Sequence, residues 1–586
     1  MSNTLRSLRA IGLTVAFLLV VVLAAGTDTP PAAAQGPTGQ LVGEPVTAVR
    51  TGVVNFAQIA ADSAKSPKRP TTRRVVPSRR FPGQRPSGVG SPILPGLAPA
   101  PAPARASSTS PLPASSFAGL DDDGTAIPPD TTGAVGLTAL METLNNNIQI
   151  QDRGGGTIST LALFDFWNAP PSVLPPGTDL GSGPFDPSVI YDPFGGRFIH
   201  SVASNDSSAQ SSVCVAVSQT SDPTGNWNRF CFDVDGTDTL TADFPRLGFN
   251  KDWIVVSMNM FAIGGGYVRG QIYAFNKAHL YNNINSGHFV FPPTGGVTDT
   301  HFTMIPAVTL DNALAIEYLV RQPDDCATCS TITKSALVGS PPSTPVLHID
   351  TAIVTSNLSS WSAFPSTGNF LPQAPPSTGT GNLGIESNDD GMLDAMVRTV
   401  DGVTSIWASQ TIFLPSGSPT HAAAQWWQVD AGTTSSSTLI QQGRVEDPTA
   451  TTSNGGKHFA YPSIAVNKFG DMLIGYSRFS SSSFASAAYS YRLAGDPGNT
   501  TRDDVTLRAG LAYYEETFGR GVNRWGDFSN TVIDPLNDID LWTIQEYAKN
   551  LVGTPSPGTD TGQWGTWWGR VFPGEIVYFP EISKSP

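Results

Sequence analysis

One short pattern recurs along the chain and constrains its fold more than any other feature. A typical copy starts with Pro, continues with alternating aliphatic residues and ends on Asp or Asn. Copies begin at residues 131, 187, 245, 306, 381, 462 and 529, so that they lie 56 to 81 residues apart. Repeats of this size that resemble strands are typical of a β-propeller, in which each repeat forms one sheet. We therefore predict an all-β chain, a β-propeller of seven blades with four antiparallel strands each.

The residues that follow each copy support strands joined by tight turns. The Asp or Asn that ends a copy is expected to hydrogen-bond to the backbone just after it, and a nearby Gly or Pro supplies the turn. The flanking runs are short and rich in aromatic and β-branched residues, and many are apolar on both faces, as stacked blades require. Residues 138–146 could form a helix, but the alternation that follows favours a strand. A pair of β-sandwiches with coincidental Pro spacing is the alternative fold.

The distribution of charge excludes some partners. The net charge is −14, yet residues 1–90 carry +8 and the rest of the chain carries −22. With this much negative charge, residues 91–586 are unlike a region that binds nucleic acid or an anionic membrane. The chain also lacks the G-x-S-x-G, H-E-x-x-H and P-loop motifs, which argues against esterase, metalloprotease and nucleotide-dependent activities.

The N-terminal fifth of the chain divides into a targeting segment and a linker. Arg6 and Arg9 precede an apolar run, and small residues then offer a cleavage site before residue 35, which predicts a secretory signal peptide over residues 1–34. An uncleaved anchor is the alternative. Residues 35–118 are rich in Pro, Ala and Arg and predict a disordered linker, although the more apolar stretch 43–62 could dock as a short strand or helix.

These boundaries place the propeller at residues 119–575, followed by a C-terminal tail at 576–586. No other stretch is long and apolar enough to span a bilayer. We expect an exported monomer with no membrane span once the signal peptide is removed.

Four cysteines in an exported chain predict two disulfides. Cys214 and Cys231 lie symmetrically about the turn Asp222–Gly225, so they should face each other across a hairpin. Cys326 and Cys329 are close in sequence at an expected hairpin tip. A redox role there would need a thioredoxin-like context and a zinc role would need a second ligand pair, so we expect a loop-closing disulfide.

Several stretches resemble a family of large secreted bacterial β-propeller proteins of uncharacterised activity, distantly similar to sialidases. Its PPDTNG-like opening is similar to residues 128–136, and its RWGDYS-like signature is similar to residues 524–529, although Thr132 stands where the family usually has Asn. Further matches occur at residues 216–225, 243–248, 461–465 and 475–477. The resemblance covers about residues 120–570 and implies a secreted propeller.

Polar residues at the starts of the repeats should converge on one pocket, because the innermost strand of each blade begins near the central channel. Carboxylates on separate strands can differ in pKa, as acid–base catalysis needs, or they can bind Ca²⁺. A structural role, in which each Asp hydrogen-bonds to neighbouring backbone amides, is the alternative. The candidate catalytic residues are Asp186, Asp243, Arg524 and Asp527. The candidate ligand-binding residues are Asp130, Arg246, Tyr461 and Glu546.

Two functions fit this sequence. The first is a non-catalytic module that binds an extracellular carbohydrate or another surface ligand. The second is a sialidase-like hydrolase or lyase acting on glycans, with an arginine cluster, a Tyr–Glu pair and Asp186 as the acid. Its further candidates are Arg398, Arg492, Tyr513, Tyr514, Glu515 and Glu516. Sugar rings could stack on Trp426, Trp427, Trp564, Trp567 or Trp568, although burial between blades is the commoner fate of tryptophan.

Overall fold

The computed structural model describes most of the chain. The described residues are 39–65, 74–76, 109–291, 301–323, 326, 328–365, 367–377, 382–519, 521–554 and 559–572. The predicted signal peptide and C-terminal tail lie outside these ranges. Among the described residues, none of the helices has the length and apolar character that a membrane crossing requires.

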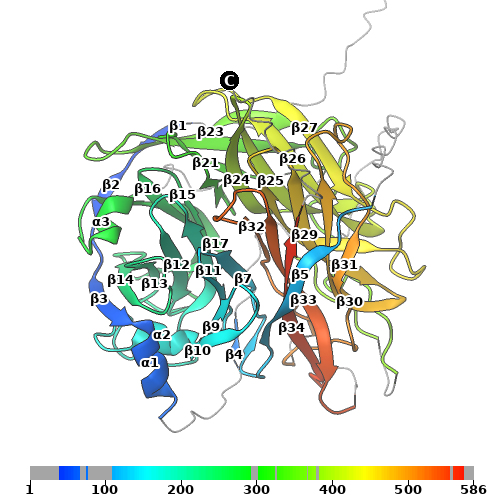
Figure 1. Ribbon diagram of the computed structural model, residues 1–586, viewed down its shortest axis with the longest axis horizontal. Coiled ribbons are helices and arrows are strands. Elements are labelled where there is room, and N and C mark those ends of the chain that lie inside the picture. The colour runs from blue at the N-terminus through cyan, green and yellow to red at the C-terminus, as the bar shows by residue number, and fades with distance from the viewer. Residues whose placement is uncertain are drawn as a thin grey trace, which may run out of the picture. The chain divides into compact units, whose positions relative to one another are not determined.

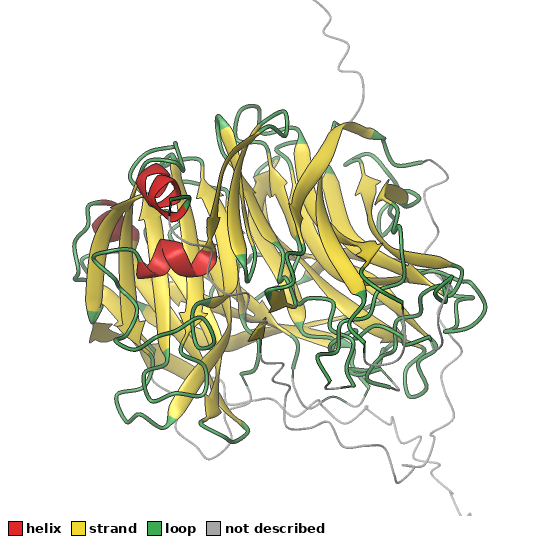
Figure 2. Cartoon of the chain, turned by 90° about the horizontal axis from the view of Figure 1, so that it is seen from below, coloured by secondary structure: helices red, strands yellow, loops and turns green. Residues whose placement is uncertain are grey.

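The chain is an all-β propeller built from antiparallel sheets (Figures 1 and 2). Five sheets of four or five strands are separate. The first contains β7 (Thr132–Val135), β8 (Ala139–Thr143), β9 (Asn147–Asp152) and β10 (Thr157–Ala162). The second contains β11 (Phe185–Asp192), β12 (Arg197–Ser204), β13 (Ser212–Ser218), β14 (Asn226–Asp233) and β3 (Arg50–Asn55). The third contains β19 (Ile305–Pro306), β21 (Glu317–Arg321), β22 (Thr331–Val338), β23 (Val346–Thr355) and β1 (Gly39–Val42).

The C-terminal part of the chain supplies the other two separate sheets. One contains β28 (His458–Val466), β29 (Met472–Ser480), β30 (Ser483–Arg492) and β31 (Val505–Arg508). The other contains β32 (Asn530–Ile533), β33 (Leu541–Leu551), β34 (Gly562–Val571) and β5 (Pro113–Asp121). A parallel pair, β4 (Arg74–Val75) with β6 (Ala126–Ile127), lies apart from these sheets.

The remaining strands form one ten-stranded sheet. One half contains β2 (Glu44–Val46), β18 (His288–Val290), β17 (Tyr267–Asn276), β16 (Trp253–Ala262) and β15 (Leu240–Phe249). The other half contains β24 (Met392–Val400), β25 (Val403–Leu414), β26 (His421–Asp430) and β27 (Leu439–Val445). Between them β20 (Val308–Thr309) pairs in parallel with both β15 and β24. The described helices are α1 (Phe56–Ser63), α2 (Leu163–Asn168) and α3 (Lys277–Tyr281).

The innermost strands close into a ring. In chain order β7, β11, β15, β19, β24, β28 and β32 each contact the next, and β32 contacts β7 again. The prediction of seven separate four-stranded blades is nevertheless wrong, because five sheets are separate and the others merge through β20. Three sheets also gain an additional outer strand from the N-terminal segment. The fifth repeat was misplaced as well: residue 381 lies outside the described residues, and the inner strand of that part of the ring is β24, at 392–400.

The turns form as the sequence predicts. Oδ1 of Asp192 accepts hydrogen bonds from the backbone N–H groups of Phe194 and Gly195 at 2.9 and 3.1 Å. Equivalent bonds start the turns at Asn250, Asp311, Asn467 and Asp534. Strands on both sides are buried on both faces, as in β16, and the apolar clusters lie between neighbouring sheets. Residues 138–146 contain β8, so the strand interpretation is confirmed.

Several inner strands share a bulge at the residue before proline. Asp186, Phe244 and Tyr461 have φ values of 48°, 57° and 57°, and the strand register shifts at each of them. Proline suits a bulge because it has no N–H to leave unbonded, whereas a positive φ costs a non-glycine residue about 1–3 kcal/mol. The bulge turns these side chains out of the regular alternation at the end of the ring where the predicted site lies.

The predicted disordered linker is partly ordered, which corrects the prediction for residues 35–118. β1, β2 and β3 pair with the outer strands β23, β18 and β14, and Figure 1 shows them in blue along the rim. α1 follows, with Asn55 capping its first turn by accepting from the N–H of Gln58 at 3.0 Å. Val54 is buried while Val53 is exposed, so the alternation of residues 43–62 marks a docked strand. β5 then completes the last sheet beside β34, so the ordered fold begins before residue 119.

Both predicted disulfides are present. Cys214 and Cys231 are directly paired between β13 and β14, and Cys326 bonds to Cys329. Disulfides persist in oxidising compartments, which agrees with an exported protein.

Candidate functional site

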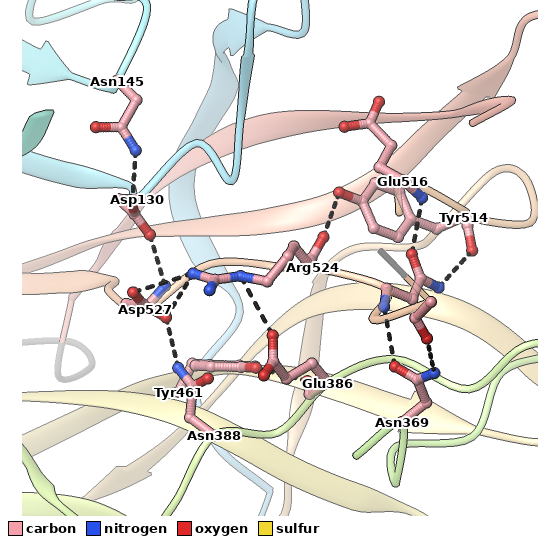
Figure 3. A network of polar contacts seen from close by, with 12 residues as sticks. Asp130, Asn145, Asn369, Glu386, Asn388, Tyr461, Tyr514, Glu516, Arg524 and Asp527 are labelled. Atoms are coloured by element: carbon pink, nitrogen blue, oxygen red, sulfur yellow. Dashed lines mark hydrogen bonds and ion pairs between the residues drawn. The ribbon is translucent and has the colours of Figure 1, made fainter. Parts of the chain in front are cut away.

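The predicted site residues come together at one end of the ring, where the inner strands begin, and Figure 3 shows Asp130, Tyr461, Arg524 and Asp527 among them. Asp186, Asp243 and Arg246 lie on β11 and β15, and Tyr461 lies on β28. Asp130 precedes β7, Arg524 and Asp527 precede β32, and Glu546 lies on β33. These residues span 417 positions of the chain but interact directly or through their charges. All of them are at most 8% exposed.

Asp130 links the first part of the ring to the last. Its Oδ1 accepts a hydrogen bond of 2.8 Å from the backbone N–H of Asp527, and its Oδ2 accepts one of 2.5 Å from Asn145. The amide oxygen of Asn145 in turn accepts from the N–H of Asp186 at 2.8 Å. Oδ2 of Asp186 then accepts from the N–H of Phe244 at 3.1 Å. These carboxylates therefore tie four consecutive inner strands together, counting from β32 to β15.

Arg524 is the cation at the centre of this network. Its Nη2 lies 3.3 and 3.2 Å from the two carboxylate oxygens of Asp527, and its Nε lies 3.2 Å from Glu386. Asn388 donates to Asp527 at 2.5 Å, and the Tyr461 hydroxyl donates to the carbonyl of Glu386 at 2.5 Å. Figure 3 shows these groups pointing at one another. The guanidinium group is thus held by two carboxylates from different parts of the chain.

Burial governs the acid–base properties of this cluster. It raises the pKa of Asp130 well above its ordinary value, and the charges of Asp527 and Asp186 raise it further. Burial also raises the pKa of Asp186, with added repulsion from Asp243 and Asp527, and that of Glu546, with repulsion from Asp130. Desolvation and repulsion between like charges both favour the protonated acids.

A cavity of about 570 Å³ runs along the axis of the ring, beyond this cluster. Residues from β7, β11, β15, β20, β24, β28 and β32 line it. Its inner end is buried, at Ser188, Arg246 and Ile464. Its outer end reaches the turns that follow the inner strands, where Phe194 is 46% exposed. The cavity therefore opens at the turn side of the ring.

Arg246 alone of the eight predicted site residues belongs to the lining of this cavity, within the described part of the chain. Arg246 is buried and forms the floor of the cavity. The carboxyl groups that act on its charge include Asp394, which also lines the cavity, and Asp186 and Asp527, which lie outside the lining. Further out, Arg398 forms an ion pair with Asp538, and Asp534 is held by Arg153. The accessible polar groups are thus different from the candidate catalytic residues.

Ca²⁺ was predicted as one possible occupant of the carboxylate ring. Within the described residues, the one group of three potential ligands whose atoms lie within 4.8 Å of one another is Cys326, Cys329 and Asp390. Its two sulfur atoms are joined in a disulfide, so it does not fit a cation. The carboxylates of Asp130, Asp186 and Asp527 instead accept hydrogen bonds from amide groups or bind Arg524, which is the structural role considered above.

The additional sialidase-like candidates do not assemble into one site. Arg398 lies at the outer part of the cavity, whereas Arg492 donates to the backbone carbonyls of Leu493 and Asp496. Tyr514 donates to the carbonyl of Arg524 at 2.6 Å and is fully buried. Four of the five candidate tryptophans are fully buried in the sheets, and Trp567 is covered by Arg508. None of these five lines the central cavity where the structure describes it.

Sequence reasoning missed Asp394, Glu386, Asn388 and Asn145. Glu386 and Asn388 lie in an irregular connection before β24. Glu386 ends the copy of the repeat that begins at residue 381, but it was not selected as a site residue. Asp394 was hidden because the fifth repeat was placed too early in the chain. Asp394 follows a bulge of β24, whereas the bulges of β11, β15 and β28 each contain a proline that β24 lacks. A search for paired strands without that proline would have found Asp394.

No family model matches this chain, and no curated protein matches it closely enough to be a relative. Among solved structures, it is similar to a protein of unknown function from Dyadobacter fermentans DSM 18053, with 9% identity over 66% of this chain and 95% of that one, at a TM-score of 0.33. The WD40 domain of SCAP from fission yeast gives 9% identity over 78% and 98%, at 0.30. The native arabinanase of Bacillus subtilis gives 12% identity over 51% and 94%, at 0.27. Likeness at this level carries no argument about activity.

Proposed function

We propose that this chain is an exported, non-catalytic binding protein whose central cavity receives the end of an extracellular glycan. The observation that carries the proposal is the axial cavity itself, to which six of the seven inner strands and β20 contribute. Its volume lies within the range of small-molecule sites, about 300–1,000 Å³. Nearly half of its lining residues carry polar side chains, and a ligand with many hydroxyl groups can hydrogen-bond to such groups.

A binding role accounts better for the buried carboxylates than catalysis does. A general acid or base must come within hydrogen-bonding distance of its substrate. Asp186, Asp243, Arg524 and Asp527 are buried behind the floor of the cavity, and Asp186, Arg524 and Asp527 interact with other protein groups. Their role in this proposal is to hold the inner strands in place around the cavity.

One observation favours glycan hydrolysis as a second candidate function. Burial raises the pKa of Asp394 to about 6, and Asp394 lines the cavity together with Asp311. A carboxylic acid with a raised pKa is one of the two carboxyl groups that glycoside hydrolysis requires. Under this alternative, Asp394 is the candidate acid, and the catalytic residues predicted from sequence do not take part.

The test is a glycan-binding array followed by a turnover assay on the chain from residue 35 onward. Val532 lines the cavity and is only half buried, so Val532→Phe should narrow it, and the melting temperature of the variant shows whether it folds. Ser418→Phe, on an exposed loop, is the matched control. We expect a bound glycan whose affinity falls with Val532→Phe, is unchanged with Ser418→Phe, and is not accompanied by cleavage. Cleavage that disappears with Asp394→Asn would establish the hydrolase instead, and absence of any binding would overturn both.

A further inference from the structure

The floor of the cavity presents a guanidinium group with unused donors. Arg246 is 6% exposed and lies against the Phe528 ring, with its Cζ 4.4 Å from the ring centroid. Its Nη2 donates to the carbonyl of Leu393 at 2.6 Å. Its Nε and Nη1 find no acceptor among the described residues. A buried charged donor without a partner is costly, and a ligand or water in the adjoining cavity is the usual explanation.

Asp394 supplies the complementary acceptor on the same floor. Its Oδ2 accepts from the N–H of Ile464 and its Oδ1 from the N–H of Ala395, both at 2.9 Å. Backbone groups of β24 and β28 therefore fix the orientation of the carboxylate. An ionised carboxylate has about four acceptor sites, so two are left for a ligand. Of the carboxylates that act on the charge of Arg246, Asp394 has the largest effect, yet the two groups form no ion pair within the described structure.

We infer that Arg246 and Asp394 together recognise neighbouring hydroxyl groups of an uncharged sugar at the inner end of the cavity. This inference rests on the proposed glycan-binding function and specifies the class of its ligand. One hydroxyl donates to the fixed carboxylate of Asp394, while the oxygen of its neighbour accepts from the guanidinium group. Arg246 offers a fixed donor and Asp394 a fixed acceptor, and the two groups face the same cavity without forming an ion pair. A sugar suits this arrangement because hydroxyl groups on adjacent carbons can each donate or accept a hydrogen bond.

The charge of the lining argues against an acidic ligand. Four carboxyl groups line the cavity against two guanidinium groups: Asp311, Asp394, Asp534 and Asp538 against Arg246 and Arg398. Arg398 is already occupied by Asp538. Asp534 is likewise paired with Arg153, so Asp311 and Asp394 remain against Arg246. A sugar acid would therefore bring its carboxylate into a lining that, beyond these ion pairs, still carries one more carboxyl group than guanidinium groups, and repulsion at short range disfavours it.

The experiment uses the chain from residue 35 onward and pairs of oligosaccharides that differ only at C6, which carries either a hydroxymethyl or a carboxylate group. Affinities are measured by calorimetry at neutral pH. We expect the neutral member of a pair to bind more tightly. Arg246→Lys keeps the charge but loses the planar donors, and Asp394→Asn keeps the shape but loses an acceptor. Each should weaken binding of the neutral sugar by about tenfold or more, as loss of hydrogen bonds to charged groups does.

Matched controls are Arg269→Lys and Asp401→Asn, which lie outside the cavity lining and should leave affinity unchanged. Melting temperatures of all variants show whether each one folds. Tighter binding of the acidic member, or unchanged affinity in folded Arg246→Lys and Asp394→Asn, overturns the inference. If Val532→Phe abolishes binding while the inference about Arg246 and Asp394 is overturned, the proposal that the cavity binds a glycan still stands. If no oligosaccharide binds the unaltered protein, both fall together.

Discussion

The carboxylate of Asp130 accepts a hydrogen bond of 2.8 Å from the backbone N–H of Asp527, although the two residues are 397 positions apart. Asp130 precedes the first inner strand and Asp527 precedes the last one, so this bond joins the two ends of the ring. Asn145 occupies the other oxygen of the same carboxylate. The buried side chain of Asp130 therefore helps to close the ring and, through Asn145, to position β11.

Asp130→Ala should destabilise the fold strongly. It leaves two buried donors without an acceptor, and alanine tolerates the φ of 54° poorly, so we expect a loss of roughly 2–5 kcal/mol in the free energy of unfolding. Denaturant unfolding monitored by tryptophan fluorescence measures this loss. Asp130→Asn, which tolerates the same φ and keeps an acceptor, should cost clearly less. Equal stability of the alanine variant would show that the closure does not depend on this bond.

Glu142 should make the fold less stable as pH rises. Burial raises its pKa to about 8, against hydrogen bonds from Thr566 and the N–H of Leu120 that lower it. Between its ordinary value of 4.5 and about 8, the folded chain keeps a proton that the unfolded chain releases. Its contribution to the free energy of unfolding therefore falls as pH increases through that window, by at most about 1.4 kcal/mol per pH unit.

Glu142→Gln removes this titration. The stability of the variant relative to the unaltered protein should increase between pH 5 and pH 8, as measured by unfolding curves at several pH values. Glu44→Gln, at an exposed position, is the control for the loss of one glutamate carboxyl group. A difference for Glu142→Gln that does not change with pH would contradict the prediction.

Val54→Asp should release the N-terminal segment from the rim. Val54 is 6% exposed and packs in the apolar cluster beside β14, whereas its neighbour Val53 is 38% exposed. A buried unpaired charge is incompatible with that cluster, so β3 should detach and expose the edge of β14. Hydrogen exchange should then accelerate in β14 for Val54→Asp and remain slow for Val53→Asp. Equal protection in the two variants would contradict the docking of this strand.

The two disulfides should differ in their contribution to stability. Cys214 and Cys231 are 17 residues apart, whereas Cys326 and Cys329 are 3 apart, and a longer closed loop restricts the unfolded chain more. Replacing the first pair by alanine should lower the free energy of unfolding by about 3 kcal/mol, and replacing the second pair should lower it by less. Differential scanning calorimetry compares the double variants; a larger loss for the second pair would refute this ranking.

Binding of a neutral sugar should weaken in acid because of Asp394. Burial raises the pKa of Asp394 to about 6, and the hydrogen bond from Ile464 and the charge of Arg246 lower it. Below this pH the carboxyl group is protonated and loses acceptor capacity towards a hydroxyl group. Affinity measured from pH 5 to pH 8 should therefore rise and level off above about 6, and Asp394→Asn should remove the dependence. A profile that persists in Asp394→Asn would assign it to another group.

The sequence by itself determined the local structure. Asp192, Asn250 and Asn467 start the expected turns, and Cys214 faces Cys231, because a turn or a hairpin register depends on residues close in the chain. The repeating strand pattern also implies a shared axis, and the structure does bring Asp130, Asp186 and Arg524 together, but in a buried network and not in the predicted pocket.

Only the tertiary structure decided which of these polar groups are buried and which face the cavity. The exposure of Asp186 or Arg246 depends on side chains supplied by other parts of the ring, such as Phe528 and Asn145, and no local pattern records that. The same holds for Asp394, whose strand lacks the proline pattern, and for β1 to β3, which become strands because distant sheet edges accept their hydrogen bonds. Packing between segments far apart in the chain, rather than local preference, therefore set the accessible chemistry of this protein.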